Sequence, residues 1–159
     1  MSARTVLSAA ICAAAVAAGA AAYVAIGSPA VAQSAPTKVH RLAFHVDSSD
    51  PAVQQLVLNN VENVSDHYKQ KGEKVQIEVV AYGPGLHMLR ADTSKVKQRI
   101  AAMSLEIDNL AFDACGNTRS KMSKAENKTI PIVSEARMVA SGVVRLLELQ
   151  EAGWSYIRP

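Results

Sequence analysis

The sequence predicts an α/β protein in which a mostly parallel sheet of about five strands carries helices on both faces. Segments with strand-like and helix-like patterns alternate along the chain, which is typical of a parallel sheet. The segments that join successive strands are long enough for right-handed crossovers. Hydrophobic residues make up 49% of the 159 residues and charged residues 19%, which favours a packed core over disorder.

Five segments have the pattern of β-strands. In the first of them, Leu42, Phe44 and Val46 occupy alternate positions, which places them on one face of a strand. The second is rich in β-branched residues, which favour extended backbone. The predicted strands cover residues 39–46, 75–82, 109–115, 136–139 and 154–157.

Four segments between these strands have helical periodicity. The first has the clearest boundaries, because Asp50 is a typical N-cap, Pro51 suits the first turn and Gly72 is a typical stop signal. Gly153 ends the last helix in the same way. The predicted helices cover residues 51–71, 94–107, 116–127 and 141–152.

The N-terminal segment has the parts of a secretory signal peptide. A positive charge at Arg4 precedes an uncharged apolar stretch over residues 6–27, and Ala30-Val31-Ala32 follows as a small-x-small cleavage site. The stretch is long for a signal peptide, so a retained membrane anchor is the alternative. We predict an exported, for example periplasmic, protein with a signal peptide at 1–32, a linker at 33–38 and one domain at 39–159.

Composition and motif spacing argue against several classes of ligand. A net charge of +3 and an aromatic content of 4% are too low to suggest a nucleic-acid partner. No histidine and cysteine have the spacing of a metal site, and we predict neither a metal nor a cofactor. The Gly83-Pro84-Gly85 turn lacks the third glycine and the lysine of phosphate-binding loops.

Reactive and flexible residues follow the first three strands. His45 ends the first strand, Gly83, Gly85 and His87 follow the second, and Cys115 ends the third. Ligands of parallel sheets gather beyond the carboxyl ends of the strands, so these loops are expected to meet at one edge. We predict Cys115, His45 and His87 as catalytic residues and Gly83, Gly85, Gly116, Asn117 and Thr118 as binding residues.

Cys115 is the only thiol that remains if the predicted signal peptide is removed. The N–H groups of the helix that follows, with Asn117 or Thr118 as its N-cap and Arg119 nearby, are expected to lower the pKa of the thiol. Gly116 is expected to let the chain turn sharply and leave the sulfur accessible. The alternative is an inert cysteine packed in the core.

Three stretches of the sequence resemble the DsrE/DsrF-like family, which is named for proteins of intracellular sulfur oxidation. They are VVAYGPGL at 79–86, NLAFDACGNT at 109–118 and SGVVRLLELQEAGWSYIRP at the C-terminal end. The resemblance covers about residues 39–159 and implies a flavodoxin-like sheet, assembly as a homotrimer or hexamer, and a persulfide carried on Cys115. Two features depart from the sulfur-relay members, namely the predicted export and the sequence after Cys115.

Two hypotheses about function follow. The first is a sulfur carrier or sulfurtransferase, in which the Cys115 thiolate takes up sulfane sulfur and passes it to an acceptor thiol, with a donor or acceptor protein as partner. The second is a non-catalytic oligomeric module that binds a small ligand or a partner protein at the strand ends.

Overall fold

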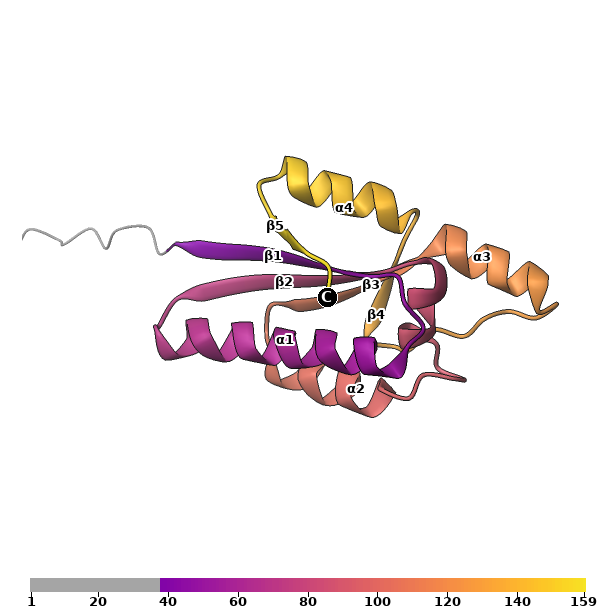
Figure 1. Ribbon diagram of the computed structural model, residues 1–159, viewed down its shortest axis with the longest axis horizontal. Coiled ribbons are helices and arrows are strands. Elements are labelled where there is room, and N and C mark those ends of the chain that lie inside the picture. Colours follow the sequence, from indigo (N-terminus) through magenta and orange to yellow (C-terminus); the bar gives the residue numbers. More distant parts are fainter. Residues whose placement is uncertain (1–37) are drawn as a thin grey trace, which may run out of the picture. The chain divides into compact units, whose positions relative to one another are not determined.

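A computed structural model describes residues 38–159 and contains one five-stranded parallel sheet with four α-helices between its strands (Figure 1). The predicted α/β, flavodoxin-like class is therefore confirmed. The predicted signal peptide at 1–32 and nearly all of the linker lie outside the described residues. Among residues 38–159, no helix is both long enough and apolar enough to cross a membrane.

The five strands lie close to their predicted positions. Their order across the sheet is β4-β3-β2-β1-β5, so the first three strands are direct neighbours. All four neighbouring pairs are parallel, and the carboxyl ends of the strands share one edge. The strands are β1 (Val39–Val46), β2 (Lys74–Ala81), β3 (Leu110–Cys115), β4 (Ala136–Val139) and β5 (Ser155–Ile157).

The helices also agree with the sequence pattern, apart from their ends. The second helix begins at Lys97 rather than at the predicted Ser94, because the Ser94 hydroxyl donates to the Met88 carbonyl and holds the preceding turn in place. A 3₁₀ segment, η1, stands where the pattern indicated only a break after the second strand. The helices are α1 (Pro51–Gln70), η1 (Gly83–Leu89), α2 (Lys97–Glu106), α3 (Gly116–Ala125) and α4 (Gly142–Glu151).

The strand order determines which face each helix covers. From β1 to β4 the chain steps across the sheet in one direction, and the last crossover returns from β4 to the far side of β1. Right-handed crossovers that run in opposite directions lie on opposite faces. Figure 1 shows this arrangement, with α1 and α2 on one face and α4 on the other.

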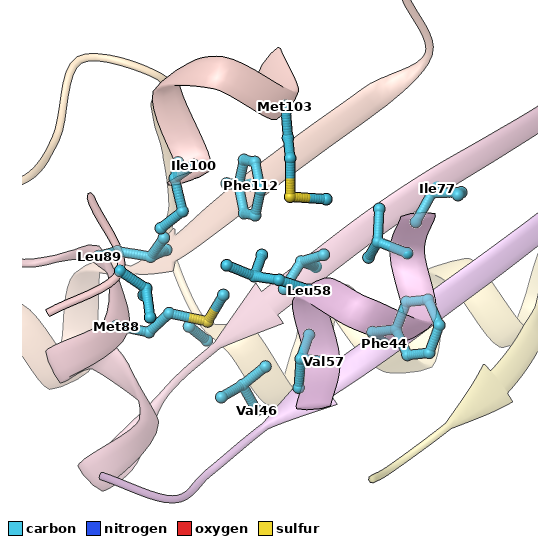
Figure 2. Close-up of a cluster of buried hydrophobic side chains, with 14 of the residues drawn as sticks. Phe44, Val46, Val57, Leu58, Ile77, Met88, Leu89, Ile100, Met103 and Phe112 are labelled. Carbon is cyan, nitrogen blue, oxygen red and sulfur yellow. The ribbon is translucent and has the colours of Figure 1, made fainter. Parts of the chain in front are cut away.

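The main core lies between the sheet and the two helices α1 and α2. Phe44, Ile77 and Phe112 project from three neighbouring strands, and Leu58 and Ile100 meet them from the helices (Figure 2). All five side chains are almost fully buried. Each contributes about 1.5–3 kcal/mol relative to an exposed side chain.

Gly85 in η1, one of the predicted binding residues, has a packing role in the structure. A Cβ atom at this position would lie 2.0 Å from the carbonyl oxygen of Val46, the last residue of β1. Gly85 is itself buried. Its missing side chain lets the loop after β2 lie directly against the end of β1, which brings the first two strand ends together.

The opposite face of the sheet has a much smaller apolar core. Ala43 and Val80 of the sheet pack against Leu146 and Leu149 of α4. Next to them, the buried carboxylates of Glu78 and Asp113 form ion pairs with guanidinium groups from the helix and the edge strand, namely those of Arg145 and Arg137. This face therefore combines a narrow apolar contact with a buried charge cluster.

Candidate functional site

The candidate site is centred on Cys115, the last residue of β3. The residue is also the N-cap of α3, because its Sγ accepts the Thr118 backbone N–H at 3.4 Å. The predicted N-cap at Asn117 or Thr118 is therefore wrong, because the sulfur itself takes the place of the usual hydroxyl or carboxylate oxygen. The thiol is thereby held at the positive end of a helix.

A second helix has its N-terminus next to the same sulfur. The backbone N–H of Gly142, the first residue of α4, also interacts with the Cys115 thiol. The loop before α4 is tied to the start of α3 by a hydrogen bond from the Asn117 N–H to the Ala140 carbonyl, at 3.2 Å. The N-termini of two helices that begin 26 residues apart in the sequence, at 116 and 142, therefore converge on one thiol.

Two opposing effects act on the pKa of Cys115. Burial has the largest single effect and raises the pKa, because a thiolate is poorly solvated in the interior. The Thr118 hydroxyl and the nearby N–H groups of Gly142 and Thr118 act in the other direction, with a smaller effect from the Asn117 N–H, whose own hydrogen bond goes to the Ala140 carbonyl. Together they outweigh burial, and the pKa of Cys115 lies below its ordinary value. The site favours the thiolate, which is the nucleophilic form.

The sulfur is not accessible in the way that sequence analysis predicted. Cys115 is only 4% exposed, although Gly116 follows it. The end of β4 and the start of α4 lie directly over this turn, and a Cβ atom on Gly116 would be 3.2 Å from the Val139 carbonyl oxygen. Gly116 therefore permits close packing rather than access. Arg119 is not a neighbour of the thiol either, because its Nε donates to the Ile130 carbonyl at 2.8 Å.

Gly83 and Thr118 form a hydrogen-bonded bridge between the loops after β2 and β3. The Gly83 N–H donates to the Thr118 hydroxyl oxygen at 2.9 Å. Gly83 has a φ of +52°, a conformation that suits glycine far better than any other residue. Because the hydroxyl oxygen accepts this bond, the hydroxyl proton is directed elsewhere, and the sulfur of Cys115 receives it.

His45 lies on the same face of the sheet as α4 and belongs to a neighbouring aromatic cluster. Its Nδ1 is 2.7 Å from the Tyr156 hydroxyl, and its ring stacks on Tyr82 with 4.6 Å between the ring centres. Its Nε2 is buried, has no hydrogen-bond partner among the described residues and lies 3.8 Å from the Asp47 carboxylate. Burial is the main cause that lowers the pKa of His45, so its ring is neutral near pH 7.

Tyr82 connects the aromatic cluster with the thiol site. One face of its ring stacks on His45, and the Cβ and ring atoms lie against Gly142 at the start of α4. His45 and Cys115 therefore share a neighbour, although no hydrogen bond between them is present. His87 is different: it lies half-buried in η1, and its side chain makes no hydrogen bond within residues 38–159.

A groove of about 430 Å³ runs beside this cluster between α4 and the ends of β1 and β5. One wall is formed by His45, Tyr82 and Tyr156, and the other by apolar side chains of α4. Among the described residues, no group of three or more His, Cys, Asp or Glu side chains is arranged to hold a metal ion.

Three residues of this site were not predicted from the sequence, namely Tyr82, Gly142 and Tyr156. Tyr82 and Tyr156 carry no motif, and the Gly142 N–H belongs to a helix that is distant in sequence from Cys115. The only signal for Gly142 was a small residue at the start of a predicted helix. Of the predicted binding residues, Gly83, Gly116, Asn117 and Thr118 lie at or next to the thiol, and Gly85 does not.

The sequence matches no protein-family model and no curated protein. Among solved structures, it is similar to the protein of unknown function MTH1491 from Methanobacterium thermoautotrophicum. The two chains are 32% identical, the similarity covers 76% of this chain and 99% of the archaeal chain, and the TM-score is 0.64.

Proposed function

Because this chain belongs to the same family as that archaeal protein, whose function is unknown, we propose a function from the chemistry of the site: the protein carries sulfur as a persulfide on Cys115. The observation that supports the proposal most directly is the convergence of hydrogen-bond donors from two helix N-termini on one thiol. The resemblance to DsrE/DsrF-like proteins agrees with this proposal, since its sulfur-relay members use a cysteine at the end of the third strand.

The transfer consists of two exchange steps. In the first, the Cys115 thiolate attacks the outer sulfur of a persulfide donor R–S–SH. A new S–S bond forms, the S–S bond of the donor breaks, and the donor leaves as the thiolate R–S⁻. In the second, an acceptor thiolate attacks the outer sulfur of Cys115–S–SH, and Cys115 leaves as the thiolate. No external oxidant or reductant is needed in either step.

The surroundings of the thiol suit both steps. Donors around the sulfur stabilise negative charge, so Cys115 is a good leaving group as well as an ionised nucleophile. At 4% exposure the sulfur meets its donor only through a local opening of the loops that cover it, which limits its reaction with other oxidants. His45 and His87 were predicted to assist. Neither is placed to take the thiol proton directly, so we expect their alanine variants to weaken sulfur loading less than loss of Cys115.

Intact-mass measurement tests this proposal. After incubation with a small persulfide such as glutathione persulfide, the wild-type protein should gain one sulfur atom, and Cys115→Ser should gain none. Circular dichroism controls for the fold of the variant. Absence of the adduct under conditions that load an established persulfide carrier would refute sulfur transfer.

The second candidate function is binding of a small molecule in the groove beside α4. The buried His45 Nε2 without a partner, at the wall of a groove of about 430 Å³, favours it. A molecule with an apolar body and one hydrogen-bonding group fits this lining. Failure of sulfur loading, together with chemical shift changes at His45 on addition of such molecules, would support this candidate instead.

We also propose that the protein self-associates through the face that carries α4 and β5. Several large apolar side chains are exposed there, with Val143 at 60%, Leu147 at 54% and Val144 at 49%. Contiguous apolar groups of this kind mark interaction surfaces. Light scattering should give more than the mass of one chain, and Leu147→Asp should lower that mass. Leu105→Asp is the matched control, since Leu105 is 86% exposed on α2 at the opposite face.

Export remains part of the proposal, and it rests on the sequence of residues 1–32. The purified mature protein should begin at or near Gln33. Intact protein that begins at Met1 and fractionates with membranes would contradict cleavage and favour the retained anchor.

A further inference from the structure

The start of α4 lies unusually close to the end of β2. A Cβ atom at Gly142 would be 2.9 Å from the Cβ of Tyr82, 3.0 Å from its Cδ1 and 3.2 Å from its Cγ. Carbon atoms that are not bonded to each other lie at about 3.5–4.0 Å at their optimum. A side chain at this position would therefore force α4 and Tyr82 apart.

The backbone conformation of Gly142 does not require a glycine at this position. This residue is not among those with a positive φ, and it begins a regular helix. Alanine is the better helix former, so helix propensity does not favour glycine here either. Glycine at this position leaves room for the Tyr82 side chain.

The same residue donates to the thiol. The Gly142 N–H is one of the groups that stabilise the Cys115 thiolate, and it is the one that comes from a different part of the chain. The Thr118 N–H belongs to the turn that directly follows the cysteine, so it stays near the sulfur whatever α4 does. The distance between α4 and Tyr82 thus determines whether the sulfur has this additional donor.

We propose that Gly142 is a positioning residue: because it lacks a side chain, the N-terminus of α4 closes on Tyr82 and its N–H reaches the Cys115 sulfur. This inference deepens the proposed function, since it assigns a residue that prepares the thiol for sulfur uptake. It rests on that function for its biological meaning, but the geometry can be tested without any sulfur chemistry.

The test is a pH titration of the Cys115 thiolate by its ultraviolet absorbance, with Cys115→Ser as the blank. Gly142→Ala should move the midpoint upward by about half a pH unit or more, the size expected for loss of a donor at a helix N-terminus. Val143→Ala is the matched control in the same helical turn, because Val143 is 60% exposed, and it should leave the midpoint unchanged. A merely destabilised fold would not move the midpoint of the folded protein.

Comparison of Gly142→Ala in the wild-type protein and in a Tyr82→Ala variant separates the effect of the contact between Gly142 and Tyr82 from a general loss of stability. Tyr82→Ala removes two of the three close atoms, so the effect of Gly142→Ala should be smaller in the double variant than in the single one. If Gly142→Ala alone does not fold, recovery of a folded double variant supports the contact. Failure to fold in both backgrounds overturns it, as does a folded Gly142→Ala protein with the midpoint of wild type.

The outcomes also distinguish this inference from the proposed function. A wild-type protein that never takes up sulfur, but whose midpoint rises in Gly142→Ala, refutes sulfur transfer and supports the positioning role. A wild-type protein that takes up sulfur, with an unchanged midpoint in Gly142→Ala, supports sulfur transfer and refutes the positioning role.

Discussion

Replacement of Thr118 by valine removes one hydroxyl group from the surroundings of Cys115 and keeps the shape of the side chain. The Thr118 backbone N–H still reaches the sulfur, but the hydroxyl donor is lost. A hydrogen bond to a charged group contributes about 1.5–3 kcal/mol, and a change of about 1.4 kcal/mol corresponds to one pH unit. We therefore expect the thiolate of Thr118→Val to form about one pH unit higher than that of wild type.

The substitution also affects stability, through two routes. The Gly83 N–H loses its acceptor, which was 2.9 Å away, and an unpaired half-buried donor costs about 1 kcal/mol at any pH. The second route depends on pH. The pKa of Cys115 is lower in the folded state than in the unfolded chain, where it is about 8.5. Ionisation of Cys115 therefore adds its full contribution to the free energy of unfolding above about pH 8.5, and this contribution is lost as the pH falls through the folded-state pKa. This gain in stability with rising pH should be smaller in Thr118→Val.

The assay is the thiolate absorbance titration, with urea unfolding at pH 6 and pH 9 as the second measurement. Thr118→Ser is the control, because it keeps the hydroxyl and should titrate like wild type. The reasoning is refuted if Thr118→Val and wild type share one midpoint. It is refuted equally if the serine variant shifts as far as the valine variant, because the hydroxyl would then not be the cause.

Two further predictions concern the surrounding fold. Gly85→Ala should lower the free energy of unfolding in urea by about 2 kcal/mol or more, because its Cβ would overlap the Val46 carbonyl. Gly83→Ala is the comparison: a Cβ there would meet open space, but the positive φ should lower the free energy of unfolding by about 1 kcal/mol. Equal losses in the two variants would contradict the packing argument. Burial is the main cause that raises the pKa of Asp113 to about 6, so its contribution to stability is greatest below about pH 4 and declines as pH rises to about 6. Asp113→Asn should remove that decline, and parallel stability profiles of the two proteins between pH 4 and pH 7 would show that Asp113 does not titrate in this range.

The local patterns of the sequence determined the secondary structure and the class of fold. Alternating apolar residues in 39–46 and the Asp50-Pro51 start of the first helix are properties of a few neighbouring residues, so they can be read without knowledge of the fold. The alternation of strands and helices then indicated a parallel sheet. Its strand ends indicated the region of the site, because the carboxyl ends of parallel strands share one edge. Cys115 and its neighbours Gly116, Asn117 and Thr118 were found in this way.

The tertiary structure decided the properties of that cysteine. Its burial depends on where β4 and the start of α4 lie, and the Gly142 donor comes from a helix whose position depends on the last crossover. His45 meets Tyr156 only because β5 returns to pair with β1, which no local pattern specifies. Sequence patterns report which face of a strand or helix is apolar, whereas contacts between distant segments depend on strand order and on close approaches such as those at Gly85 and Gly142. For this reason the sequence identified the thiol, and only the tertiary structure determined its exposure, its donors and its pKa.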